Sequence, residues 1–164
     1  MLEIITEYLK SLPKETIVMI MGALPISELR GAIPLALYYG MPLGKAFWLA
    51  VLSNSLIVAP ALLFFEPVTF RLRKIPLCAR FFDWVFERTK KKADAVQRYE
   101  ALGLAIFVAI PLPMTGAWSG VIAASLFKIK FRYAFPAIIA GVFIAGILVS
   151  FLCKMGMLSW RAVH

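Results

Sequence analysis

Glu28 and Arg30 are the first residues whose types and position suggest chemistry, because they follow an apolar stretch over residues 16–26. A charge at the centre of a bilayer costs about 2.5–3.5 kcal/mol on insertion scales, so such residues usually serve a function. A carboxyl group shielded from water can take up and release a proton, and a guanidinium can attract an anion. We interpret the two as substrate-binding and coupling residues. The alternative is a structural ion pair, or two groups that snorkel to an interface, although their i, i+2 spacing argues against a simple pair on a regular helix.

A second motif, Pro111–Trp118, offers polar and aromatic counterparts in the other half of the chain. The hydroxyl of Thr115 either lines a cavity or bonds to its own backbone, and for Ser119 we expect the backbone bond. Trp118 is either a substrate contact or an interfacial anchor. The two motifs predict helical hairpins whose turns contain Pro25, Gly31, Pro34, Pro111, Pro113 and Gly116.

Further polar residues flank or interrupt the apolar segments. Asn54 lies in the middle of a long apolar segment, where an amide usually bonds to a neighbouring helix. Lys128, Lys130 and Arg132 follow another apolar segment and are expected to form a basic rim on the cytoplasmic side.

The composition indicates whether this chain folds in water or in a membrane. Of its 164 residues, 62% are hydrophobic and 16% charged, whereas soluble domains have roughly 45–50% apolar and about 25% charged residues. A chain of this length cannot bury so much apolar surface in its own interior. The net charge is +9, and the basic residues flank the apolar segments. This position favours anionic lipid headgroups over nucleic acid as the partner. We therefore expect an all-α integral membrane protein, multi-pass in a prokaryotic inner or plasma membrane.

The order of apolar segments predicts one membrane domain built from two repeats. Each repeat has two half-length apolar stretches, too short to span, followed by a segment of about twenty residues that can. The predicted parts are an interfacial amphipathic helix 1–15, a first repeat 16–65, a basic cytoplasmic segment 66–100, a second repeat 101–153 and a tail 154–164. An offset of 86 residues places Pro25 on Pro111 and overlays the two long segments.

The half-length stretches allow two topologies. In the first, residues 16–39 form one continuous transmembrane helix, and the chain crosses four times. In the second, each pair forms a re-entrant hairpin, each repeat crosses once, and the two repeats have inverted orientations. The second places the basic residues 128–132 in the cytoplasm and agrees better with the positive-inside rule. We therefore expect the inverted repeat with hairpins.

Several function classes lack their signature residues. The sequence contains no phosphate-binding glycine-rich loop with a lysine, no metal-ligand spacing and one histidine, His164, at its end. We expect no enzymatic activity, no cofactor and no resident metal. A gradient, or the downhill flow of the substrate, must then drive any transport.

The two motifs also resemble those of a known family. The segments Ser27–Pro34 and Pro111–Trp118 resemble the signature segments of the small multidrug export family, which is similar in predicted architecture to the DedA/VTT membrane proteins. The family name implies drug export. The DedA-like relatives imply movement of polyprenyl-phosphate carrier lipids or phospholipids between leaflets, with Glu28 and Arg30 as the matching residues. Met114 departs from the expected glycine, and the second motif has no arginine.

Three functions follow from these observations. The first is a gradient-driven transporter or flippase for an amphipathic anion such as a polyprenyl phosphate or phospholipid. The second is a proton-coupled exporter of drug cations, against which Arg30 counts, and the third is a membrane assembly protein that transports nothing. We expect membrane lipids as partners and a homodimer, with Gly141, Ala145 and Gly146 as the packing face.

Overall fold

Helices account for nearly all of the part of the chain that the structure describes. The computed structural model describes residues 12–72, 93–111 and 116–163, and no strand occurs within these ranges. The helices are α2 (Lys14–Ala23), α3 (Glu28–Tyr38), α4 (Leu43–Leu72), α6 (Ala93–Ala109), α7 (Ala117–Leu126) and α8 (Phe131–Val163). The expected all-α fold is confirmed. The predicted interfacial helix 1–15 lies almost wholly outside the described residues, and α2 begins only after Pro13.

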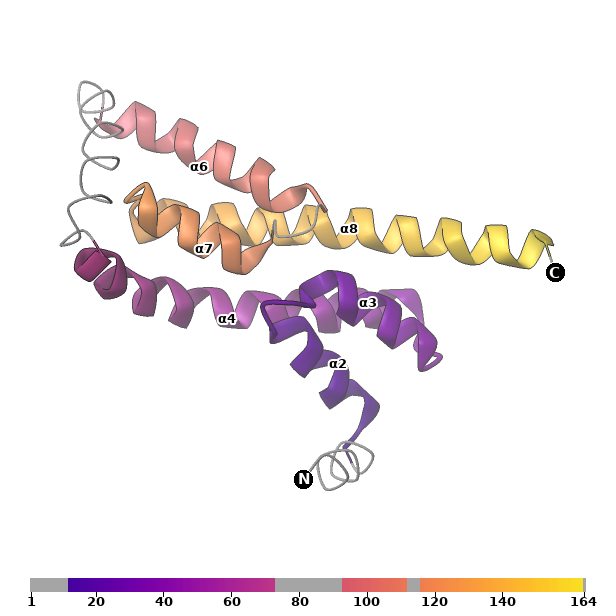
Figure 1. Ribbon diagram of the computed structural model, residues 1–164. Helices are drawn as coiled ribbons and strands as arrows, with labels where there is room; N and C mark the ends of the chain where they lie inside the picture. The colour runs from indigo at the N-terminus through magenta and orange to yellow at the C-terminus, as the bar shows by residue number, and fades with distance from the viewer. Residues whose placement is uncertain (1–11, 73–92, 112–115, 164) are drawn as a thin grey trace.

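Two of these helices are long and apolar enough to cross a membrane. The qualifying segments are Leu43–Phe64 of α4 and Phe131–Ser159 of α8. At 30 and 33 residues, the two helices are about 45 and 50 Å long, against a hydrocarbon layer of about 30 Å. They pack against each other and run in opposite directions (Figure 1).

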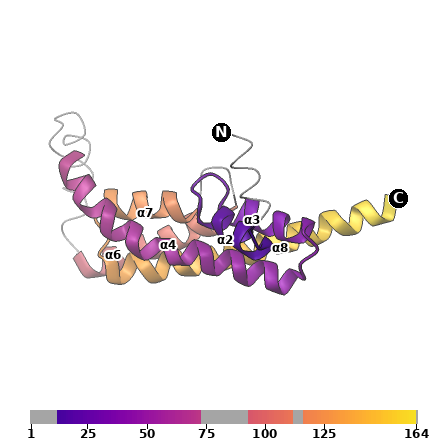
Figure 2. The ribbon, with the colours of Figure 1, turned by 90° about the horizontal axis from the view of Figure 1, so that it is seen from below.

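Both long helices extend beyond their predicted limits. α4 continues through residues 66–72, which the sequence assigned to the basic segment, and α8 continues through the predicted tail to Val163. Charged residues mark a change of surrounding solvent, but they do not interrupt the backbone hydrogen bonds of a helix. The end of α8 therefore projects past the other helices in both views (Figures 1 and 2).

The other described helices are shorter, and two of them are separated by a sharp break. α2, α3 and α7 have 10, 11 and 10 residues, so each is about 15 Å long, half of the hydrocarbon thickness. The single helix over 16–39 does not form, because the chain breaks at residues 24–27. Pro25 has no backbone N–H to donate, and the turn closes with a bond of 3.1 Å from the Glu28 N–H to the Leu24 carbonyl.

Two of the predicted turn residues lie elsewhere. Gly31 and Pro34 are part of α3, which begins at Glu28. A Cβ on Gly31 would lie 2.7 Å from the Ser27 Cβ, so this glycine permits tight packing directly after the break. Pro34 lies inside α3, where its ring has no N–H for the usual i→i−4 hydrogen bond.

The two halves of the chain repeat the same local geometry. Gly40 and Lys128 both have left-handed backbone, with φ of 78° and 51°, and each ends a short helix. In each cap the next residue donates five positions back, Met41 to the Ala36 carbonyl and Ile129 to the Ala124 carbonyl. The positions that match are 88 residues apart, rather than the 86 suggested by the sequence, and the long helices begin at the same separation.

The small residues of α8 pack inside the chain. A Cβ on Gly141 would lie 2.7 Å from the Ala105 carbonyl oxygen of α6, and one on Gly146 would lie 2.8 Å from the Phe47 ring of α4. Ala145 is buried as well. The expectation that these residues form an interface between subunits is therefore wrong, because close contact with α4 and α6 already uses them.

This packing predicts the effect of one methyl group on α8. In a helix Gly→Ala normally stabilises by about 1 kcal/mol. At Gly141 we expect the opposite, a loss of about 1–3 kcal/mol, because the methyl group meets backbone that cannot move without parting α6 from α8. The measurement is thermal unfolding of the purified full chain in detergent.

Gly156→Ala is the matched control. Gly156 lies on the same helix with nothing within 4 Å of its added Cβ, so this change should leave the unfolding temperature equal or higher. Equal behaviour of the two variants would contradict the observed packing of α6 against α8.

Candidate functional site

The breaks in the two halves of the chain meet, and a carboxylate joins them. Glu28 reaches from the first break to the N-terminal end of α7, where its Oε1 accepts a hydrogen bond of 3.2 Å from the Trp118 backbone N–H. The backbone N–H of Ala117 also interacts favourably with this carboxylate. The first N–H groups of a helix have no partner within the helix, and the helix dipole favours a negative charge there. Glu28 therefore caps a helix 90 residues further along the chain.

A second contact runs in the opposite direction between the same segments. The Trp118 indole Nε1 donates a hydrogen bond of 3.0 Å to the carbonyl of Ala23, the last residue of α2. The final carbonyls of a helix also lack partners within the helix. Each half of the chain thus supplies a side chain that satisfies the broken helix of the other half.

Gly116 and Ser119 shape the place where the carboxylate binds. A Cβ on Gly116 would overlap the Glu28 carboxylate, so only glycine allows this close approach. The Gly116 N–H donates a bond of 2.8 Å to the Ser119 Oγ, whose hydroxyl also contacts the Gly116 carbonyl. The expectation that Ser119 bonds to local backbone is confirmed.

Glu28 itself has unusual backbone geometry. Its φ is +46°, in the left-handed region, which costs a residue other than glycine roughly 1–2 kcal/mol. The turn holds this conformation partly through the Ser27 hydroxyl, which donates to the Met21 carbonyl. Since glycine would fit the backbone more easily, the carboxylate side chain gives this position its role.

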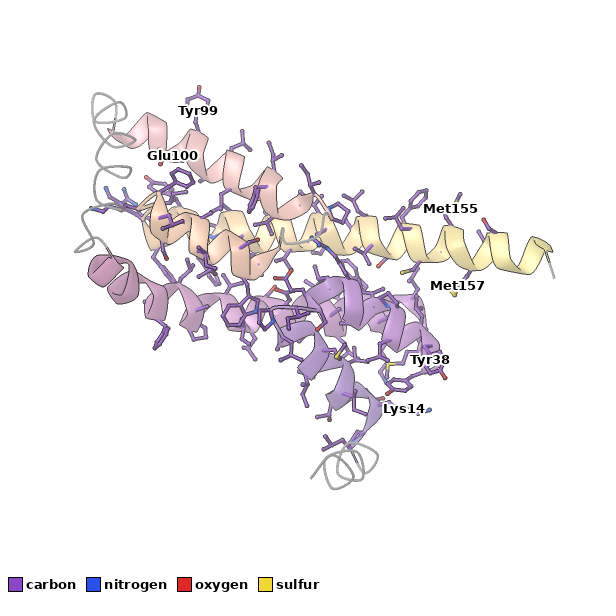
Figure 3. The ribbon with its side chains drawn as sticks, viewed as in Figure 1. Lys14, Tyr38, Tyr99, Glu100, Met155 and Met157 are labelled. Carbon is purple, nitrogen blue, oxygen red and sulfur yellow. The ribbon has the colours of Figure 1, made fainter. Side chains whose placement is uncertain are left out.

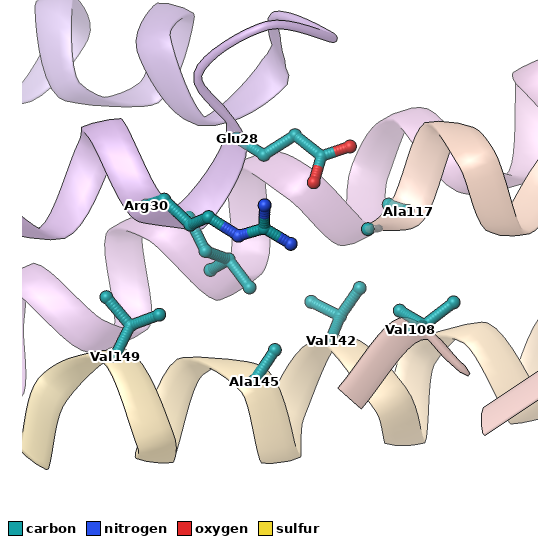
Figure 4. A pocket seen from close by; sticks show the side chains of 9 residues that line it. Glu28, Arg30, Val108, Ala117, Val142, Ala145 and Val149 are labelled. Carbon is teal, nitrogen blue, oxygen red and sulfur yellow. The ribbon is translucent and has the colours of Figure 1, made fainter. Parts of the chain in front are cut away.

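Arg30 lies beside this carboxylate, as Figure 4 shows, and the two side chains interact electrostatically. Both line a small cavity whose other walls are the backbone near Gly116 and the apolar side chains Val108, Val142, Ala145 and Val149. Its volume of about 10 Å³ is close to the space that one water molecule needs. A lipid headgroup or drug can enter only after side chains or helices move.

The remaining predicted site residues are spread over several places. Thr115 and Pro113 lie outside the described residues, while Pro25 lies in the first break and Pro111 two residues beyond the end of α6. Lys128, Lys130 and Arg132 are exposed where α7 passes into α8, and the Arg132 guanidinium stacks on the Tyr133 ring at 4.7 Å.

Asn54 does not bond to a neighbouring helix as the sequence suggested. Its side chain is 1% exposed, and neither polar atom of its amide has a hydrogen-bond partner among the described residues. Burying such an amide without a partner costs about 1–3 kcal/mol. Asn54 is therefore a buried polar residue whose amide is not satisfied by the described part of the chain.

The contact between Trp118 and Ala23 was missed by reasoning from the sequence. The offset of 88 residues seen in the structure places Arg30 on Trp118 and Glu28 on Gly116. At that offset, each of these two charged residues corresponds to an uncharged residue of the second half. The junction is therefore asymmetric, with both charged groups supplied by the first half.

Comparison with known proteins now connects this geometry to a family. The model of the family described as "Putative small multi-drug export protein" matches residues 28–148, from Glu28 through most of α8 and including both sides of the junction. The chain belongs to this family. Neither the curated proteins nor the solved structures gave a match.

Membership, together with the two apolar helices, identifies a membrane protein of an export family. The expectation from the two sequence motifs is confirmed at the level of the family. The matched range begins at Glu28 and contains Trp118, the two residues joined by the hydrogen bond at the start of α7.

The left-handed backbone of Glu28 predicts an inverted order of stability for two substitutions. Glu28→Gly and Glu28→Ala both remove the cap from α7, but only alanine keeps the cost of positive φ. We expect the glycine variant to be about 1 kcal/mol more stable than the alanine variant, although alanine is normally the better helix residue. Thermal unfolding of both full-length variants in detergent tests this, and a more stable alanine variant would contradict the turn geometry.

The Trp118 indole predicts a different pair of variants. Trp118→Phe keeps an aromatic ring but leaves the Ala23 carbonyl without its donor, so we expect a loss of about 1–3 kcal/mol in unfolding free energy. Trp48→Phe is the control, because Trp48 is about half exposed and a phenyl ring can keep its contacts with Phe47 and Phe143, so stability should change little. Equal losses from both variants would show that the indole bond contributes nothing specific.

Proposed function

We propose that this protein is a gradient-driven membrane transporter for an amphipathic anion, of the kind represented by polyprenyl phosphates and phospholipids. The observation that carries the proposal is the carboxylate of Glu28 at the N-terminal end of α7. A helix N-terminus beside a guanidinium is an anion site by its electrostatics. Here the protein's own carboxylate occupies that site, so a substrate anion is expected to compete with it.

The architecture that we propose is an inverted repeat with two re-entrant hairpins in a multi-pass cell-membrane protein. Its support is the separation of 88 residues between matching caps and the opposite directions of α4 and α8. The packing is also paired. α2 packs on α4 as α6 packs on α8, and both α3 and α7 contact both long helices. The length of α2, α3 and α7 suits hairpins that turn back near the midplane.

A proton can couple to the substrate at this junction. When Glu28 is ionised, it holds the α7 N–H groups and faces Arg30. When Glu28 takes up a proton, the carboxyl loses its charge and binds a helix N-terminus less strongly. The N–H groups and the guanidinium are then available for a phosphate group. A cavity of about 10 Å³ requires that the hairpins part before the headgroup enters, which links binding to opening.

For the energy source and for enzymatic activity, we keep the expectations from the sequence. We propose that no nucleotide is hydrolysed on this chain and that no cofactor takes part. The family description favours drug export as the second candidate. We also propose that the protein is similar to the DedA membrane proteins, that it forms a homodimer and that its substrate is a lipid.

Vesicle flux tests the proposal directly. We expect purified full chain in proteoliposomes to move a fluorescent polyprenyl phosphate between leaflets, faster with a proton gradient. Glu28→Gln keeps the side-chain shape without the charge, and Arg30→Ala removes the guanidinium. Each should lower the flux about tenfold or more.

Glu15→Gln is the control for loss of a carboxylate. Glu15 forms an ion pair of 2.6 Å with Lys45 at the start of α2, far from the junction along that helix, and both side chains are about half exposed. The hydrogen bond from Lys45 lowers the pKa of the Glu15 carboxyl, so any stabilisation is present at neutral pH and is lost on acidification. Flux of cationic dyes without lipid flux would support the drug exporter instead. Normal lipid flux in both junction variants would exclude the proposed site.

A further inference from the structure

An apolar groove lies between α6, α7 and the loop before α8, away from the junction. Its volume is about 430 Å³, in the roughly 300–1,000 Å³ range of small-molecule pockets. Leu104 and Phe107 of α6 line it on one side, and Ala123, Phe127 and Ile129 line it on the other. It shares no lining residue with the small cavity at Glu28.

One carboxylate interrupts this apolar lining. Glu100 belongs to the groove and is partly buried, next to the exposed Tyr99 on α6 (Figure 3). Among the described residues no ion pair involves Glu100. The apolar section of α6 begins at Tyr99, so the carboxylate lies at the entrance to that section rather than in its middle. A negative charge therefore lies at one end of an apolar space.

The end of a helix adds to this negative potential. α7 finishes at Leu126, and Phe127 and Ile129, just beyond it, are part of the groove wall. The C-terminal end of a helix carries a partial negative charge of roughly half an electron. Glu100 and the α7 dipole thus act on the same space with the same sign.

We infer that this groove binds a lipophilic organic cation, with its charged centre at Glu100 and its apolar body against Phe107 and Phe127. Lys128 and Lys130 flank Ile129 of the groove wall in the sequence, but both are exposed and neither lines the groove. An apolar molecule without charge would gain burial but nothing from the carboxylate, and an anion would be repelled. The site is independent of the proposed anion transport, because it uses neither Glu28 nor Arg30.

Equilibrium binding of tetraphenylphosphonium to the purified full chain in maltoside micelles tests the inference. We expect saturable binding that weakens about tenfold or more in Glu100→Gln, a change that removes the charge and keeps the shape. Triphenylphosphine oxide, a neutral molecule of similar body, should bind wild type and variant alike. Glu15→Gln is the control for loss of a carboxylate elsewhere and should leave tetraphenylphosphonium binding unchanged.

Further variants and added lipids distinguish this site from the proposed anion site and from a lipid-binding site. Arg30→Ala should bind tetraphenylphosphonium as wild type does, whether or not its lipid flux is lost, so the two proposals can fail separately. Equal affinity of wild type and Glu100→Gln would overturn the inference. Loss of tetraphenylphosphonium binding on addition of phosphatidylethanolamine, but not of phosphatidylglycerol, would also overturn it, since a lipid amine would then be the occupant.

Discussion

The end of a helix leaves backbone groups without a partner in the helix, and here two helix ends are satisfied by side chains from opposite halves of the chain. The Trp118 indole binds the free carbonyl at the end of α2, while the Glu28 carboxylate binds the free N–H at the start of α7. Left without a partner, each buried group would cost about 1–3 kcal/mol. Much of the surrounding geometry follows from this exchange, including the missing side chain at Gly116 and the left-handed backbone of Glu28.

The same exchange connects stability with function. One of its two bonds depends on an ionised group, so its strength varies with a proton, while the other bond is neutral and does not. Opening the junction must break both bonds together, because both run between the same two segments. A site held closed by its own charged side chain can be opened by a competing ion or by loss of that charge.

The helix α7 gives the protein two regions of opposite electrostatic character. Its N-terminal end, with Arg30 nearby, attracts anions and is occupied by Glu28. Its C-terminal end borders the apolar groove that contains Glu100, where we propose that a cation binds. A helix of ten residues separates the two ends by about 15 Å. One short helix can therefore present two ligand classes to a small protein without mixing their sites.

The sequence alone indicated a membrane environment, an all-α fold and the family. Hydrophobic composition cannot be reconciled with a water-soluble chain of this length, and two apolar segments long enough to span are visible without a structure. The motifs around Glu28 and Trp118 also marked the places where helices break. These are local properties, and they depend only on residues close together in the chain.

Tertiary structure decided how the parts meet. That Glu28 faces α7, that Trp118 reaches Ala23, and that Gly141 packs on α6 are contacts between residues far apart in sequence. The repeat register of 88 residues became visible through matching left-handed caps, because backbone geometry repeats where side chains do not. Asn54 could not be placed by its type, since an amide bonds only where packing brings it a partner.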